Sequence, residues 1–166
     1  EISPESFLIA NETIRSRVSA LHENIMKWGV PNVFITCNDP KDFSSLKNYF
    51  DLIVIDAPCS GEGFFRKDRN SIAEWSESNV KLCSARQKRI LSDVLDSLKE
   101  DGILIYSTCT FSKEENEENV KFIASQGNFD TIKIKLRDEW KISETVVSSG
   151  NYNFYTYRFY PHRVKG

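Results

Sequence analysis

The chain is poor in the groups that metal sites and membrane spans require. Its four cysteines, at positions 37, 59, 83 and 109, form no Cys-x-x-Cys pair, and only two histidines are present. We therefore expect no zinc site, and we interpret the cysteines as reduced thiols. No apolar stretch approaches the roughly 18 residues that cross a bilayer, and residues 1–4 do not look like a signal peptide. The sequence predicts a soluble, cytoplasmic protein without membrane contact.

A strong excess of charge of either sign is also lacking. With 22 basic and 24 acidic residues, the formal charge of −2 excludes a protein that is basic over its whole surface. Contact with nucleic acid must then come from local clusters, and residues 66–69 (Arg-Lys-Asp-Arg) and 158–165 are the two candidates. The 166 residues, of which 40% are hydrophobic, provide enough material for one domain with a sizeable core.

What is present is an alternation of short apolar runs with segments of helical periodicity. The order is typical of βαβ units, so we predict an α/β fold with a mostly parallel sheet. Expected strands cover residues 7–10, 33–37, 52–55 and 102–107, and expected helices cover 14–28, 80–99 and about 112–125. Gly29 is expected to end the first helix, and a capping box at Ser112–Glu115 to open the third. Later strands at 131–136 and 154–160, with a flexible segment at 143–153, are expected at an edge or antiparallel.

The beginning expected of a cofactor-binding α/β domain is missing. Such a domain normally starts with a strand and a glycine-rich turn, and nothing before Phe7 can supply them. Residues 160–166 look like the approach to a further strand. We therefore interpret residues 1–166 as an internal fragment of such a domain, from its second strand onward.

Two cysteines follow predicted strands in matched positions. Cys59 comes three residues after Asp56, where one strand ends, and Cys109 comes just after the strand at 102–107. Because ligands of parallel sheets sit at the carboxyl ends of the strands, we expect both thiols at that edge. A thiolate that adds to C6 of cytosine makes C5 nucleophilic, and a carboxyl group such as that of Asp56 can assist at N3 and the exocyclic amine. The pattern favours methylation of cytosine, with attack and release divided between the thiols in either order.

The segments around both cysteines closely resemble the signature segments of the NOL1/NOP2/Sun RNA (cytosine-5) methyltransferases. They are residues 56–67 (DAPCSGEGFFRK) and 107–117 (STCTFSKEENE), and residues 62–67 and 160–166 look most like the bacterial RsmF-type ribosomal RNA branch. The resemblance implies a Rossmann-like class I methyltransferase fold, here without its first strand, glycine-rich loop and last strand. It also implies methylation of cytosine C5 in RNA, above all ribosomal RNA, with S-adenosylmethionine as cofactor and a covalent cysteine–C6 adduct.

The resemblance further implies a role for each catalytic candidate. Cys109, in the Thr-Cys motif, is then the nucleophile, and Cys59, in the Pro-Cys motif, helps to release the product. Asp56 is the assisting carboxyl group. DNA cytosine-5 methyltransferases use the Pro-Cys residue as the nucleophile, so Cys59 is the rival assignment for attack.

Acidic residues after the strands fit the outline of the cofactor. The acid after the second strand of such a sheet binds ribose hydroxyls, which indicates Glu12, and Asp39 is expected near the adenine. Asp56 is assigned to the cofactor site as well. A basic loop beside a thiol that handles a base suits phosphate contacts, which indicates RNA binding by Arg66, Lys67 and Arg69.

Each of these assignments has a plainer alternative. Acids after strands often cap the next helix, which would account for Glu12 and Asp39. The basic loop can be an ordinary solvated loop, and Cys37 and Cys83 are expected to be buried structural residues. For the whole chain, the alternatives are a transfer RNA methyltransferase with the same chemistry and a non-catalytic RNA-binding module that retains the fold.

Overall fold

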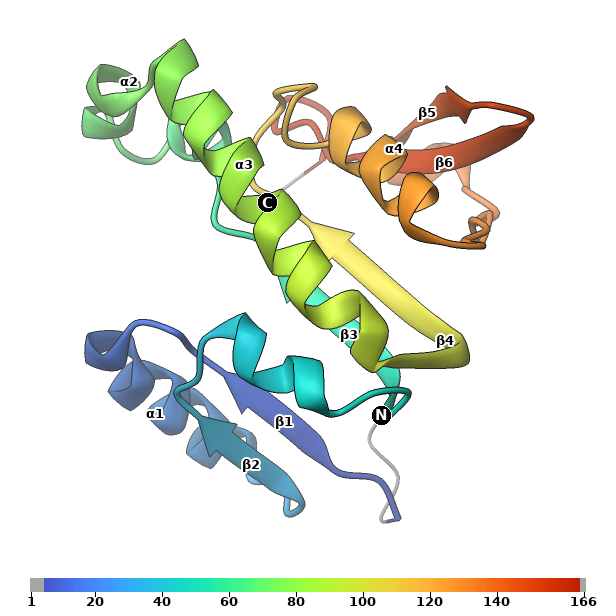
Figure 1. Ribbon diagram of the computed structural model, residues 1–166. Coiled ribbons are helices and arrows are strands. Elements are labelled where there is room, and N and C mark those ends of the chain that lie inside the picture. The colour runs from blue at the N-terminus through green and yellow to red at the C-terminus, as the bar shows by residue number, and fades with distance from the viewer. Residues whose placement is uncertain (1–4, 165–166) are drawn as a thin grey trace. The chain divides into compact units, whose positions relative to one another are not determined.

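The computed structural model describes residues 5–164 and consists of two compact units (Figure 1). The first comprises Glu1–Asp51 and Asp93–Gly102, and the second comprises Leu52–Ser92 and Ile103–Gly166. Within residues 5–164, none of the helices combines the length and the apolar composition that a membrane span requires.

The first unit contains a parallel strand pair with a helix packed against it. Strand β1 (Leu8–Asn11) pairs with β2 (Val33–Thr36) in a register that sets Leu8 opposite Val33. Between them lie the 3₁₀ turn η1 (Arg15–Arg17) and helix α1 (Val18–Trp28), which packs against β2. Helix α1 ends at Gly29, whose φ of +66° is in the left-handed region that glycine adopts without strain. The predicted β–α–β order and the glycine stop are confirmed.

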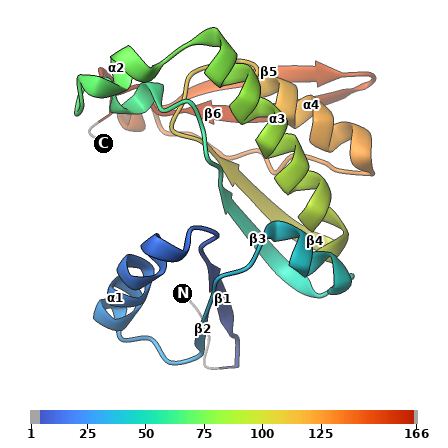
Figure 2. The ribbon, with the colours of Figure 1, turned by 60° about the vertical axis from the view of Figure 1, so that its left-hand side comes forward.

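The second unit contains the carboxyl ends of two further paired strands. Strands β3 (Phe50–Asp56) and β4 (Leu98–Ser107) are neighbours in one sheet. Just past them, the Ala57 amide donates to the Ser107 carbonyl, and Cys59 lies beside Cys109. Residue numbers therefore rise in the same direction along both strands. The strands are therefore parallel, and Figure 2 shows both arrows pointing the same way.

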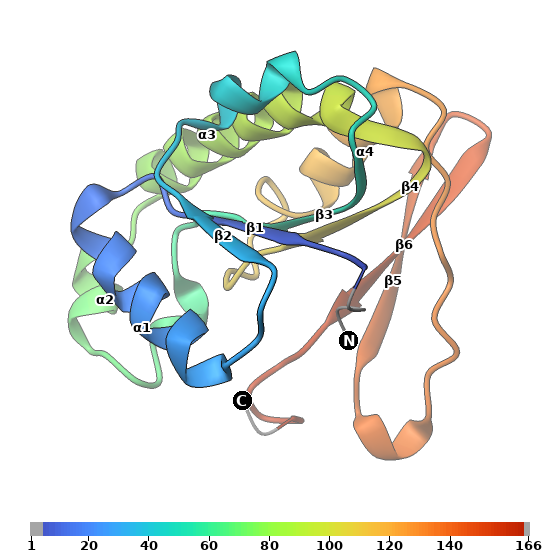
Figure 3. The same cartoon turned by 90° about the horizontal axis from the view of Figure 1, so that it is seen from below.

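Most of the remaining elements belong to the second unit. They are η3 (Glu62–Phe64), α2 (Asn70–Glu74), α3 (Glu77–Val94), α4 (Glu117–Gln126), η5 (Asp138–Trp140), β5 (Ser143–Ser149) and β6 (Tyr152–Arg158). Strands β5 and β6 form the antiparallel hairpin seen in Figure 3, and α4 packs against β5. The core of this unit includes Leu91 of α3, Ile123 of α4, Val147 of β5 and Phe154 of β6.

The long helix ends earlier than its periodicity predicts. We expected it to continue to Lys99, but α3 ends at Val94, and the turn η4 (Leu95–Ser97) leads into β4 at Leu98. The Ser97 hydroxyl donates to the Val94 carbonyl at 2.6 Å, and the backbone carbonyl of Ser97 accepts from the Tyr49 amide at 2.9 Å. Bonds to a distant segment thus replace the helical bonds that a longer helix would make.

The expected strand at 131–136 is also wrong. These residues form a loop that is bonded through side chains, because the Tyr155 amide donates to the Thr131 hydroxyl and the Ile134 amide donates to the Tyr157 hydroxyl. The segment at 143–153, expected to be flexible, contains β5 and a turn at Gly150 with φ of +59°. The strand expected at 154–160 is confirmed as β6, which runs from 152 to 158 and is antiparallel to its neighbour.

Candidate active site

The structure brings Cys59 and Cys109 into direct contact in the loops that follow β3 and β4. Their Sγ atoms are 2.9 Å apart, and the Cys109 amide donates to Cys59 Sγ at 3.3 Å. Both are free thiols, Cys59 half-buried and Cys109 exposed. Two sulfur atoms this close together can both contact one small molecule or one base that approaches from the solvent.

Asp56 lies beside this thiol pair. It is the last residue of β3, it is exposed, and its negative charge acts on Cys109. Although Cys109 as a residue is exposed, its thiol is partly covered by neighbouring atoms. This partial burial is the largest cause that raises the pKa of the thiol, from an ordinary value of 9.0 to about 12, followed by the hydrogen bond with Cys59 and the charges of Cys59 and Asp56. Cys109 is therefore a thiol, not a thiolate, in the free protein.

The raised pKa predicts slow alkylation of Cys109. At about pH 8 a pKa of about 12 in place of 9.0 lowers the thiolate fraction about a thousand-fold, while the more basic thiolate is about twenty times more nucleophilic. The rate with iodoacetamide, followed by peptide mass spectrometry, should then be about 50-fold below that of glutathione and should still rise with pH where glutathione has levelled off. Asp56→Asn should speed the reaction, since it removes a negative charge. Alkylation of Cys109 as fast as glutathione at this pH would contradict the electrostatic account.

Glycine at position 63 permits a close crossing of the two loops. The Gly63 amide donates to the Cys109 carbonyl at 2.7 Å, and a Cβ at this position would lie 2.6 Å from the same oxygen. Next to it, Glu62 Oε2 accepts from the Phe111 amide at 2.7 Å and from the Thr110 hydroxyl at 3.1 Å. The loop of Cys59 and the loop of Cys109 are thus bonded backbone to backbone and through one carboxylate.

We expect Gly63→Ala to impair the site more than the fold. The new methyl group must displace the Cys109 carbonyl, and a shift of about 1 Å at a reacting group can cost up to about 100-fold in rate. The rate of the methyl transfer that the sequence predicts should therefore fall by about that factor, while the melting temperature changes little because Gly63 is not in the core. Gly127→Ala, where the new methyl group meets only the Phe129 ring at an ordinary contact distance of 3.5 Å, is the control for adding a methyl group to a glycine without a close backbone contact. Equal losses of activity in both variants would refute the steric argument.

The sequence did not predict that Glu115 is buried. The capping box predicted for Ser112–Glu115 is wrong: Ser112 bonds Glu114, the helix begins only at Glu117, and Glu115 is fully buried instead of solvated. Its partner Gln87 is fully buried as well. The signal that indicates Gln87 is helical phase, since it shares a face of α3 with four other buried residues. These are Val80, Cys83, Ser84 and Leu91. No comparable signal exists for Glu115, which stands in an acidic run.

The predicted RNA-binding residues lie in an exposed loop of the second unit. Arg66, Lys67 and Arg69 are all exposed, and Arg66 Nη1 donates to the Pro161 carbonyl at 3.0 Å. Among the candidates near the C-terminus, Arg158 is used inside the protein: it forms an ion pair with both oxygens of Glu117 and donates to the Phe111 carbonyl at 3.2 Å. Residues 165 and 166 of the terminal motif lie outside the described residues.

The candidate cofactor residues Glu12 and Asp39 lie in the first unit. Half-buried Glu12 follows β1, and its Oε1 accepts from the Ile14 amide at 2.8 Å. Asp39 follows β2 and caps the turn η2 (Pro40–Ser45), with Oδ1 accepting from the Lys41 amide at 3.1 Å. Asp39 makes the capping contact of the plainer alternative, whereas Glu12 bonds the Ile14 amide just before η1 and caps neither η1 nor α1. A carboxylate oxygen can accept more than one hydrogen bond, so these contacts are compatible with binding of ligand hydroxyls.

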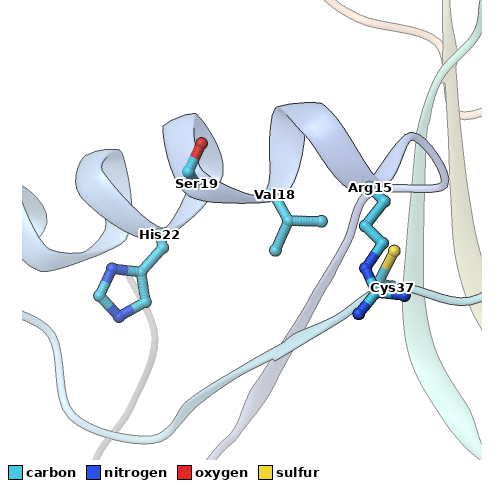
Figure 4. A pocket seen from close by; sticks show the side chains of 5 residues that line it. All are labelled: Arg15, Val18, Ser19, His22 and Cys37. Carbon is cyan, nitrogen blue, oxygen red and sulfur yellow. The ribbon is translucent and has the colours of Figure 1, made fainter.

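An open pocket between α1 and the end of β2 is lined by Arg15, Val18, Ser19, His22 and Cys37 (Figure 4). Cys37 is exposed there, so the expectation that it is buried is wrong, whereas Cys83 is buried as expected. Among the described residues, no group of three or more histidine, cysteine and acidic side chains is placed to hold a metal ion.

A model of a known protein family matches nearly the whole chain. Residues 2–166 match the model of a family described as 16S rRNA methyltransferase RsmB/F. The ribosomal RNA small subunit methyltransferase F of Psychromonas ingrahamii is 42% identical over 124 residues, which are 74% of this chain and 26% of that protein. Its counterpart in Pectobacterium atrosepticum is 40% identical over 126 residues, or 75% and 26%. The chain thus spans about a quarter of the length of these relatives.

A solved structure shares the fold. NSun6 from Pyrococcus horikoshii, crystallised with SFG, superposes with a TM-score of 0.64 at 26% identity, over 96% of this chain and 38% of that one. The predicted α/β, Rossmann-like methyltransferase fold is thereby confirmed.

Proposed function

Because the chain belongs to the 16S rRNA methyltransferase RsmB/F family, we propose that it methylates C5 of a cytosine in ribosomal RNA through a covalent adduct. The observation that carries this proposal is the contact of two free thiols, 2.9 Å apart, beside the carboxylate of Asp56. One thiol can attack the base while the other stays close enough to act on the same ring.

In the proposed reaction Cys109 Sγ, after losing its proton, forms a bond to C6 of the cytosine. The electron pair of the C5–C6 double bond then makes C5 nucleophilic, and Asp56 stabilises the developing charge at N3 and the exocyclic amine. After the methyl group has joined C5, the proton on C5 passes to water, the C5–C6 double bond re-forms and the Cys109 thiolate is expelled. Cys59 assists this release, and Cys109 then takes up a proton in place of the one it lost, which returns both sulfurs to thiols.

S-adenosylmethionine is the cofactor of this methyltransferase family, and the related NSun6 structure holds its analogue SFG. It supplies a methyl group bound to a positively charged sulfur. We propose that Glu12 accepts hydrogen bonds from the ribose hydroxyls and that Asp39 lies near the adenine. Both residues are acceptors after parallel strands, as such contacts require. Asp56 is assigned to the cofactor as well as to the base.

RNA is proposed to reach the thiols as an extruded base. Arg66, Lys67 and Arg69, exposed in the loop after Cys59, would then contact phosphates and contribute a salt-dependent part of the affinity. The chosen RNA is proposed to be that of the small ribosomal subunit, because the curated relatives carry that name. Transfer RNA remains the second candidate from the sequence.

The direct test is incubation of the protein with S-adenosylmethionine and either small-subunit ribosomal RNA or transfer RNA. Digestion to nucleosides and mass spectrometry should detect 5-methylcytidine in the ribosomal RNA. Methylation of transfer RNA alone would show that transfer RNA is the substrate in place of ribosomal RNA. Binding of RNA without any methylated nucleoside would favour the non-catalytic RNA-binding module.

A further inference from the structure

Glu115 is a carboxylate with no exposure to solvent that lies behind the two thiols. Its Oε2 accepts from the Ser60 amide at 3.0 Å and from Gln87 Nε2 at 2.7 Å, while Oε1 accepts from the Ser60 hydroxyl. These donors are neutral and come from the Cys59 loop and from helix α3.

The partners of Glu115 lie on both sides of Cys59, and one of them contacts the residue that follows Cys109. Ser60 follows Cys59 directly, and Gln87 Nε2 also donates to the carbonyl of Pro58, on the other side of Cys59, at 2.9 Å. The Ser60 hydroxyl is 2.9 Å from the hydroxyl of Thr110, which follows Cys109 directly. One carboxylate thus joins the residues around Cys59 to the residue after Cys109.

The backbone of Glu115 is itself fixed to β4 and α4. Its carbonyl accepts from the Tyr106 hydroxyl at 2.8 Å and from Asn119 Nδ2 at 3.1 Å, and Asn119 Nδ2 also donates to Gln87 Oε1 at 2.7 Å. Removing a carboxylate from water is costly, and apolar residues of similar volume often stabilise a core as well or better. The cost therefore indicates a role other than stability.

We propose that Glu115 is a positioning residue that holds the Cys59 loop against the Cys109 loop and so sets the distance between the two sulfurs. It touches neither the base nor the cofactor and acts through Ser60, Gln87 and Thr110. Its importance for methyl transfer rests on the proposed function, but its effect on the thiol pair does not.

The test uses the distance between the thiols directly. The protein is incubated with glutathione disulfide. One cysteine attacks the reagent's disulfide bond, forms a mixed disulfide and releases one glutathione thiol. The other cysteine then attacks the mixed disulfide, releases the second glutathione thiol and gives a Cys59–Cys109 disulfide. The rate, followed by mass spectrometry of the linked peptides, should fall about tenfold or more in Glu115→Leu, because loss of the three acceptor contacts moves the loops by a fraction of an ångström or more. Glu115→Gln should stay within about threefold of the parent, since its amide can still accept on one side and can donate to the Ser60 hydroxyl on the other.

A control variant separates positioning from stability. Leu91→Ala also weakens the second unit, since Leu91 is fully buried in α3, but its apolar side chain makes none of the bonds that join the loops. The variants are compared where circular dichroism shows each to be folded, and Leu91→Ala should form the disulfide at the parental rate.

Three outcomes would overturn the proposal: a parental rate in Glu115→Leu, an equal loss in Leu91→Ala, or no disulfide in the parent protein. A protein that gives the expected disulfide rates but methylates no RNA would instead refute the proposed function and leave the role of Glu115 standing.

Discussion

Cys109→Ala is expected to lower the rate of methyl transfer to RNA by about a thousand-fold or more. In the proposed mechanism only the Cys109 thiol attacks C6, so without it the covalent adduct cannot form. The rate is measured as 5-methylcytidine formed per enzyme in single-turnover conditions, so that product release does not mask the chemical step. Since Cys109 is exposed, the substitution should leave the melting temperature nearly unchanged.

Cys83→Ala is the matched control for the loss of a thiol. Cys83 is buried in α3, so this variant should lose stability and retain its rate per folded molecule. A Cys109→Ala protein that keeps a tenth or so of the activity would remove Cys109 from the role of nucleophile.

Cys59→Ala is expected to accumulate a covalent protein–RNA complex. With Cys109 intact, attack and methylation proceed, but release slows because its assisting thiol is gone. A denaturing gel should then show a slowly migrating species that forms with S-adenosylmethionine and disappears on digestion with ribonuclease. In the parent protein the same species should be at or below detection.

The double variant Cys59→Ala, Cys109→Ala identifies the attacking sulfur, because it should form no complex. The reverse pattern, in which Cys109→Ala accumulates the complex and Cys59→Ala does not, would assign attack to Cys59, as in DNA cytosine-5 methyltransferases.

Much of the parallel α/β framework could be predicted from the sequence, because it depends on local patterns. The apolar runs before Asn11 and Asp56 are strands, and Gly29 ends a helix through its own backbone preference. The meeting of Cys59 and Cys109 follows from the same patterns, since two parallel neighbours that end at matched positions deliver their next residues to one edge.

Features fixed by distant partners could not be predicted in this way. The end of α3 at Val94 depends on Asn48 and Tyr49, whose amides bond the carbonyls of Asp96 and Ser97. The burial of Glu115 depends on Ser60 and Gln87, 55 and 28 residues away. Local sequence gives no reason for Glu115 to face the core while Glu114 and Glu118 face solvent.

The ion pair between Arg158 and Glu117 has a consequence for how these two positions change during evolution. Arg158, at the end of the last hairpin, also bonds the Phe111 carbonyl in the segment that follows Cys109. A single charge reversal at either position would set like charges together in a site with little water, whereas an exchange of both charges would retain the attraction. Lineages that change one of these residues should therefore change the other, although 41 positions separate them along the chain.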